Sequence, residues 1–149
     1  MVSFGGTKCG ALGAEAIVVY REGLADSLAF QRKQAMQLAS KLRFVGAQLV
    51  ALLEDDLWRE LASTANAMAQ RMSDGLGRHG VKVALPVDTN AVFVRLSQEV
   101  RAELARTYAF GVWEGELARF MAAWDSTPAT VDAFVDELQR AVSGARLEV

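Results

Sequence analysis

The chain is poor in the residues that build disulfide frameworks, metal centres and nucleic-acid surfaces. Its 149 residues contain one cysteine and one histidine. One cysteine cannot form an internal disulfide, so we expect a reducing cytoplasm. One cysteine and one histidine are too few ligands for a structural zinc site, so we expect no metal. The 16 basic and 18 acidic residues are mixed and leave a net charge of −2. This mixture, without a basic stripe, argues against nucleic acid as a partner.

Long apolar runs are also missing. The longest, around residues 44–53, contains Gln48 and is far shorter than the roughly 20 residues that cross a bilayer. The first residues lack the charged start, apolar run and cleavage site of a signal peptide, so we expect no membrane association. Hydrophobic residues still make up 52% of the chain before its 12 glycines are counted. A small monomer does not readily bury so many, which predicts a homodimer or a higher homo-oligomer.

Glycine is concentrated at the start of the chain. Residues 3–13 hold four glycines and one lysine, Lys8. Glycine lets a backbone approach a ligand closely, and a partly buried lysine can attack a carbonyl as a neutral amine. The stretch is therefore a candidate Schiff-base site, although a flexible glycine-rich N-terminus fits the same pattern.

Two phosphate-binding motifs do not fit this stretch. A P-loop needs Ser or Thr after its lysine, whereas here Thr7 precedes Lys8 and Cys9 follows it. A dinucleotide fingerprint needs a preceding strand, and we expect none before residue 5. These two alternatives are therefore set aside.

Apolar periodicity predicts the secondary structure of the remaining chain. The β-branched run 16–20 predicts a buried strand without partners in the sequence. Apolar residues spaced by three and four over 26–53 predict one long helix, and a second is expected over 57–76, ended by Gly77 and Gly80. The later pattern predicts strands 81–85 and 91–96, a helix over 98–108 capped by Ser97, strands 110–113 and 117–124, and a helix from Pro128 to Gly144 capped by Thr127.

Together these elements predict an α+β fold. Long helices would lead into a small antiparallel sheet that carries helices on one face. We expect three segments. Residues 1–25 contain the glycine-rich stretch and one strand, residues 26–80 form the long linking helices, and residues 81–149 form a small C-terminal α+β domain.

Several stretches of the chain resemble one enzyme family. Residues 3–8 (SFGGTK) and 10–16 (GALGAEA) are similar to the cofactor-lysine segment of low-specificity L-threonine aldolases. These are fold-type I enzymes of the β-eliminating lyase group, and they use pyridoxal 5′-phosphate (PLP). The similarity continues through residues 31–34, 41–44, 53–58, 66–71 and 89–94 and ends near Arg119 and residues 124–127.

The resemblance implies roles for four residues. Lys8 would be the catalytic lysine that binds PLP covalently, and Thr7 would lie at the edge of the cofactor. Arg43 would help to anchor the cofactor phosphate. Arg119 would bind the substrate α-carboxylate through two parallel hydrogen bonds. From the residues alone, a solvated surface charge is the favoured interpretation of Arg119, and it explains Arg43 at least as well as a site role does.

The resemblance covers only the C-terminal part of the family. Residues 1–25 would be a remnant of the large cofactor domain, and residues 81–149 would match the small C-terminal domain of fold-type I enzymes. The family's upstream half, which holds the PLP ring and phosphate, has no counterpart in the sequence.

Two functions are therefore expected as alternatives. The first is a threonine-aldolase-like lyase that cleaves small β-hydroxy-α-amino acids to glycine and an aldehyde. It would be inactive as this chain alone. It would act only with a separate chain that supplies the missing N-terminal half, or it would be a remnant of a longer gene product. The second is a non-catalytic, self-associating α+β module derived from such an enzyme.

Overall fold

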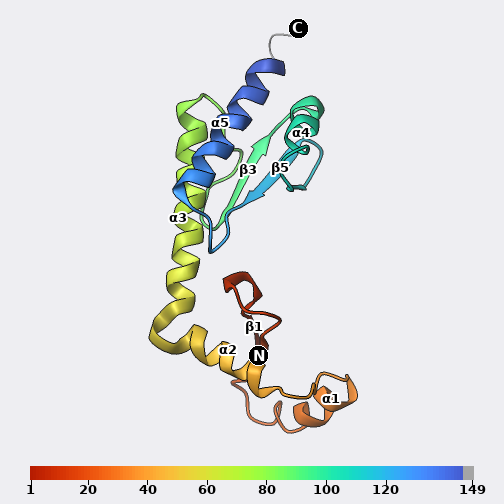
Figure 1. Ribbon diagram of the computed structural model, residues 1–149. Coiled ribbons are helices and arrows are strands. Elements are labelled where there is room, and N and C mark those ends of the chain that lie inside the picture. The colour runs from red at the N-terminus through yellow and green to blue at the C-terminus, as the bar shows by residue number, and fades with distance from the viewer. Residues whose placement is uncertain (146–149) are drawn as a thin grey trace. The chain divides into compact units, whose positions relative to one another are not determined.

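The computed structural model describes residues 1–145; residues 146–149, at the end of the predicted third segment, lie outside the described residues. The chain divides into two compact units, Met1–Glu60 and Leu61–Val149. The first runs from red to yellow in Figure 1 and the second from yellow to blue. Small antiparallel sheets combine with helices, which confirms the predicted α+β class. Within residues 1–145, no helix is both long and apolar enough to cross a membrane.

The first unit begins with a two-stranded antiparallel sheet. β1 (Val2–Gly5) pairs with β2 (Glu15–Val18), and the 3-10 helix η1 (Thr7–Cys9) lies in the connection between them. Three predictions are corrected here. β1 forms the start of the glycine-rich stretch, where no strand was expected, and it supplies the backbone partner that the strand predicted at 16–20 was expected to lack. That strand is also not buried, because Ile17 is 62% exposed.

The single helix predicted over 26–53 is wrong, because the structure contains two helices there. α1 (Leu28–Gln34) and α2 (Arg43–Leu53) are separated by a turn in which Met36 and Lys41 have positive φ values of 55° and 60°. Most helical stability in proteins comes from burying an apolar face. α1 contains no buried residue. Its apolar face therefore gains no packing in this unit that would stabilise a longer helix.

The next helix runs two residues past its predicted end and contains Gly77, so only Gly80 terminates it as predicted. α3 (Leu57–Arg78) follows the 3-10 helix η2 (Glu54–Asp56), and Gly80 beyond its end has a φ of 72°. The N–H of Val81 donates to the carbonyl of Leu76, and the N–H of Gly80 donates to that of Gly77, both at 3.0 Å. This pair of bonds is a Schellman motif, and the buried Leu76 and Val81 side chains both join the core.

The second unit contains a three-stranded antiparallel sheet in the order β3–β5–β4. These strands are β3 (Ala91–Arg95), β5 (Leu117–Met121) and β4 (Gly111–Val112), each shorter than its predicted range. The strand predicted at 81–85 is reduced to one bridge between Val83 and Val94. Pro86, three residues later, has no N–H to donate to a sheet, so the pairing cannot continue through it.

Two helices complete the second unit, and both begin at the predicted caps. α4 (Gln98–Leu104) starts where the Ser97 hydroxyl accepts from the N–H of Val100 at 3.3 Å. α5 (Pro128–Ala145) starts where the Thr127 hydroxyl accepts from the N–H of Thr130 at 3.2 Å. A side-chain oxygen at this position satisfies one N–H that the helix itself leaves without a partner.

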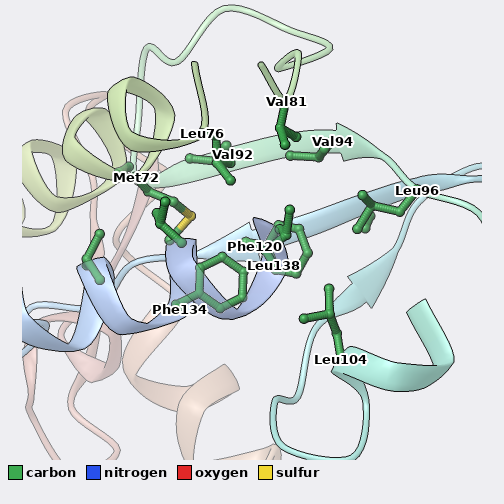
Figure 2. Close-up of a cluster of buried hydrophobic side chains, with 14 of the residues drawn as sticks. Met72, Leu76, Val81, Val92, Val94, Leu96, Leu104, Phe120, Phe134 and Leu138 are labelled. Carbon is green, nitrogen blue, oxygen red and sulfur yellow. The ribbon is translucent and has the colours of Figure 1, made fainter. Parts of the chain in front are cut away.

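The core of the second unit lies between its sheet and its helices. Figure 1 shows α3 and α5 beside β3 and β5, and Figure 2 shows side chains from both layers meeting. The helices cover one face of the sheet, as predicted. The cluster comprises Ala69, Met72, Leu76, Val81, Val92, Val94, Leu96, Val100, Leu104, Ala118, Phe120, Ala122, Val131, Phe134, Val135 and Leu138.

We expect this core to dominate the stability of the second unit. Leu138 is 0% exposed and Leu85 is 48% exposed. Leu138→Ala should lower the free energy of unfolding by about 2–5 kcal/mol because it leaves a cavity. Leu85→Ala, the matched control, should change it by less than about 0.5 kcal/mol. Urea unfolding followed by tryptophan fluorescence measures both, and equal losses would contradict this account.

A surface ion pair makes the stability of the same unit depend on pH. Arg71 donates from Nε and Nη2 to the two carboxylate oxygens of Asp132, at 2.7 and 2.6 Å. These hydrogen bonds hold the pKa of the Asp132 carboxyl below its usual value. A carboxyl with a lowered folded pKa stabilises the fold above its unfolded pKa, and this contribution is lost as pH falls through the folded pKa.

Asp132→Asn should therefore destabilise the chain at neutral pH, and the difference from the unmodified chain should shrink below roughly pH 4. Urea unfolding at neutral and acidic pH measures this difference. Asp88→Asn, at an exposed turn, is the control. If Asp132→Asn lowers the free energy of unfolding by the same amount at neutral and acidic pH, the ionic contribution is excluded.

Candidate functional site

Lys8 lies on a hydrogen-bonded turn between β1 and β2. The N–H of Gly6 donates to the carbonyl of Ala14 at 2.7 Å. The carbonyl of Gly6 accepts from the N–H groups of Cys9 and Ala11 at 2.9 and 3.0 Å. These bonds close the chain on both sides of Lys8, so the glycine-rich stretch forms a defined turn.

Crowding, and not backbone conformation, requires glycine at position 6. The φ of Gly6 is −89°, which any residue can adopt. A Cβ at this position would lie 2.8 Å from Cδ1 of Leu52 and 2.9 Å from Cβ of Ala11. Leu52 belongs to α2, so this helix packs directly against the backbone that precedes Lys8.

Gln48 fastens the other side of the turn to α2. Its Oε1 accepts from the N–H of Leu12 at 2.6 Å, and its Nε2 donates to the carbonyls of Phe44 at 3.2 Å and Leu12 at 3.4 Å. The sequence marked Gln48 only as an interruption of an apolar run. Nothing in that pattern indicates a residue 36 positions away as its partner, so sequence reasoning missed this role.

The side chains of the turn are accessible. Lys8 is exposed, so the partial burial considered for it is not found. The Thr7 hydroxyl donates to Oε1 of Glu15 at 3.2 Å. This bond links the residue that precedes Lys8 to a carboxylate on β2.

Arg43 is the first residue of α2 and is exposed. Its Cζ lies 4.9 Å from the ring centroid of Phe44. None of the hydrogen bonds described within residues 1–145 joins Arg43 to Thr7 or Lys8. Its role at the cofactor phosphate therefore stays a prediction.

Arg119 belongs to the second unit, on the middle strand of the sheet. Ala118 and Phe120 on either side of it are buried in the core. Successive side chains of a strand point to opposite faces, so Arg119 lies on the face away from the helices. Its Cζ lies 5.7 Å from the ring centroid of Trp113, and Trp113 meets Phe93 edge-on at 6.2 Å.

We call Phe93, Trp113 and Arg119 the aromatic–arginine cluster. Sequence analysis identified only its arginine. Strand alternation contained a usable signal for Phe93, because it lies between the buried Val92 and Val94 and must face the same side as Arg119.

The structure therefore joins Thr7 and Lys8 on one turn, places Arg43 in the same unit, and places Arg119 in the other. An exposed amine, a hydroxyl and a guanidinium are groups that can bind the aldehyde and phosphate ends of PLP. Within residues 1–145, no polar or charged side chain is buried, so none offers a sheltered carboxylate to the pyridine ring. The described residues thus fit part of a PLP site. Nor does any group of three or more His, Cys, Asp and Glu residues in that range have the arrangement of a metal site.

Two curated proteins match nearly the whole chain. A low-specificity L-threonine aldolase from Pseudomonas aeruginosa is 38% identical over 148 residues, which cover 97% of this chain and 42% of that protein. A low-specificity L-threonine aldolase from a Pseudomonas species is also 38% identical over 148 residues, covering 96% and 42%. The match lies in the C-terminal part of the relatives, so the chain spans about two fifths of their length. No family model matches the chain.

Solved structures support the same relationship. Threonine aldolase from Leishmania major matches with a TM-score of 0.68 and 26% identity, over 78% of this chain and 36% of that one. A serine palmitoyltransferase from S. paucimobilis with bound PLP–myriocin aldimine matches with a TM-score of 0.55 and 18% identity, over 69% and 29%. The second likeness shows the fold alone. Both neighbours are fold-type I enzymes, which confirms the expected fold class.

We expect the tight packing at Gly6 to hold the lysine turn in place. Gly6→Ala should force Leu52 or the turn to move, at a cost of about 1–3 kcal/mol, so the amides of Gly6 and Ala11 should exchange with deuterium roughly ten- to hundredfold faster. Gly46→Ala in α2 is the control, because a Cβ there meets nothing within 4 Å. Unchanged exchange at Gly6→Ala would show that the turn does not depend on this contact.

Proposed function

Because the chain is homologous to the C-terminal part of the low-specificity L-threonine aldolases, we propose that it is the lysine-bearing part of a PLP-dependent lyase. The reaction would cleave a small β-hydroxy-α-amino acid to glycine and an aldehyde. The observation that carries this proposal is Lys8 itself, an exposed amine on a hydrogen-bonded turn in a chain matched over 97% of its length.

Each predicted site residue has a distinct task in this proposal. When bound, PLP supplies an electron sink for the bonds at the substrate Cα. Lys8 holds the cofactor covalently through Nζ, and Thr7, oriented by Glu15, lies at the cofactor edge. Arg43 binds the cofactor phosphate. Arg119 binds the substrate α-carboxylate through two parallel hydrogen bonds, which fixes the orientation of the substrate.

We further propose that activity needs the regions of the family that these 149 residues do not match, in the same or in a separate polypeptide. The first unit buries only Ala14 and Leu52 among its apolar side chains. Phe30, Phe44 and Val50 are more than half exposed. Exposed apolar surface of this kind is typical of protein interfaces. It supports two partners, namely the polypeptide that carries the unmatched regions and a second copy of the chain. The single cysteine supports a reducing cytoplasm as the location.

The alternative function is a non-catalytic, self-associating α+β module. Two observations favour it. The second unit has a core of its own, and the described residues offer no sheltered partner for the PLP ring. In this alternative, Lys8 records ancestry and performs no chemistry.

Titration of the chain with PLP separates the two functions. The lyase proposal predicts a saturable visible absorption band from lysine-bound PLP, lost in Lys8→Ala. Lys33→Ala, which removes an exposed lysine from α1 of the same unit, should keep the band. A band that is absent, or that persists in Lys8→Ala, would favour the alternative.

Catalysis is tested in a chimera in which this chain replaces the matching C-terminal part of the Pseudomonas aeruginosa aldolase. The chimera should release glycine from L-threonine. Lys8→Ala should reduce that rate by orders of magnitude, because it removes the group that holds the cofactor, whereas Lys33→Ala should not. A folded chimera that binds PLP without releasing glycine would contradict the proposed reaction.

A further inference from the structure

The Arg119 side chain lies beside the Trp113 ring, on the face of the second unit's sheet that points away from the helices. Trp113 follows β4, and Phe93 lies on β3, with β5 between these strands. Neighbouring strands are about 4.8 Å apart, so two strands with one between them are separated by about twice that distance. The ring centroids of Trp113 and Phe93 are nevertheless only 6.2 Å apart, at an interplanar angle of 85°. The two rings therefore approach each other over β5, next to Arg119.

The register of the sheet places Arg119 directly between Phe93 and Gly111 on the neighbouring strands. Phe93 is the direct partner of Arg119 on one side, and Gly111 is its direct partner on the other. A Cβ at Gly111 would lie 3.7 Å from Nε and 3.8 Å from Nη2 of Arg119. The guanidinium thus extends across the space that a larger side chain at position 111 would fill.

The backbone that carries Trp113 is fixed from two directions. The N–H of Trp113 donates to the carbonyl of Leu117 at 2.8 Å. In the following turn, Arg101 donates from Nη1 to the carbonyl of Gly115 at 2.8 Å. Trp113 itself is 61% exposed, so its ring contributes little to the core and needs another explanation for its position.

The donors of Arg119 are left available by this arrangement. None of the hydrogen bonds or ion pairs described within residues 1–145 uses its side chain. An aromatic ring holds a guanidinium through cation–π attraction without occupying its in-plane N–H groups. A carboxylate neighbour would have occupied those groups.

We propose that Trp113 is a positioning residue that holds the Arg119 guanidinium in one orientation, ready to bind a carboxylate. Phe93 braces the ring, and the missing side chain of Gly111 leaves room for the guanidinium. A long, flexible side chain that is ordered in advance loses less conformational freedom when its ligand binds. The inference rests on the proposed function for the ligand, which would be the α-carboxylate of a small amino acid.

The direct test is the mobility of Arg119, measured by ¹⁵N NMR relaxation of its Nε–Hε group in the full chain. Arg119→Lys identifies the signal by its loss. We expect an order parameter near about 0.8 in the unmodified chain, below about 0.6 in Trp113→Leu, and a largely restored value in Trp113→Phe, which keeps an aromatic face. The Nε–Hε signal of Arg71, which donates to Oδ1 of Asp132, is the internal control and should not change.

A second pair of variants tests the same point without touching the ring. Gly111→Ala should leave the Arg119 signal unchanged, because its Cβ fits at ordinary contact distance. Gly111→Val should displace the guanidinium and increase its mobility, while valine favours the strand conformation of β4 and keeps the sheet intact. An Arg119 signal that is equally mobile in the unmodified chain, Trp113→Leu and Gly111→Val would overturn the proposal.

Titration of the Pseudomonas aeruginosa chimera with L-threonine in the presence of PLP distinguishes failure of this inference from failure of the proposed function, because the chimera contains the regions that the proposed function requires. L-threonine should shift the Arg119 signal and L-threoninol, which lacks the carboxylate, should not. Trp113→Leu should weaken the L-threonine effect roughly three- to tenfold, and Trp113→Phe should restore it. Equal affinity in Trp113→Leu would overturn the positioning role. A third result is also informative. If Trp113→Leu makes an ordered Arg119 mobile but L-threonine does not shift the Arg119 signal, the positioning role is supported and the result counts against the proposed function.

Discussion

The pairing of β5 on both of its edges constrains the rest of the second unit. Its inner side chains, Ala118 and Phe120, lie in the core, and Phe120 packs against Phe110 and Phe134 at centroid distances of 5.0 and 4.8 Å. Because a strand alternates between faces, a slip of one residue would expose Phe120 and bury the Arg119 guanidinium without a partner. Both consequences are costly, so the packing of the core also fixes the face on which the aromatic–arginine cluster forms.

The first unit holds the turn around Lys8 by a different principle. It has few buried apolar side chains, and the turn around Lys8 is held by backbone hydrogen bonds, by the close approach of Leu52 to Gly6, and by Gln48. Such local contacts fix a backbone without requiring a large core. The two parts of the proposed site, one for the cofactor and one for the substrate carboxylate, are therefore stabilised by separate sets of interactions.

The sequence predicted elements well where burial and local chemistry agree. α5 combines a hydroxyl cap at Thr127, a proline at its first position and a regular apolar stripe, and α3 ends at a glycine that adopts a left-handed conformation. These signals lie within a few residues of the element they define. The resemblance also identified the family, because the cofactor-lysine segment and the stretches after it match over most of the chain.

Prediction failed where the outcome depends on distant partners. The apolar spacing over 26–53 does not reveal the left-handed residues Met36 and Lys41, because periodicity reports which faces are apolar and not where the backbone turns. β1 was missed because four residues provide too short a pattern without knowledge of β2. Trp113 could not be linked to Arg119 from sequence, because their contact depends on the register of β4 with β5 and on the missing side chain at Gly111.

The uneven distribution of buried residues also matters while the ribosome makes the chain. Every residue of the main core cluster lies between Ala69 and Leu138, so none of it exists when the first 60 residues have been made. At about 5–20 residues per second, the remaining 89 residues of the second unit take about 4–18 s to synthesise. During that interval Phe30, Phe44 and Val50 are apolar side chains on a nascent segment with little core of its own. These side chains are therefore exposed to water and to other proteins before the core of the second unit can form.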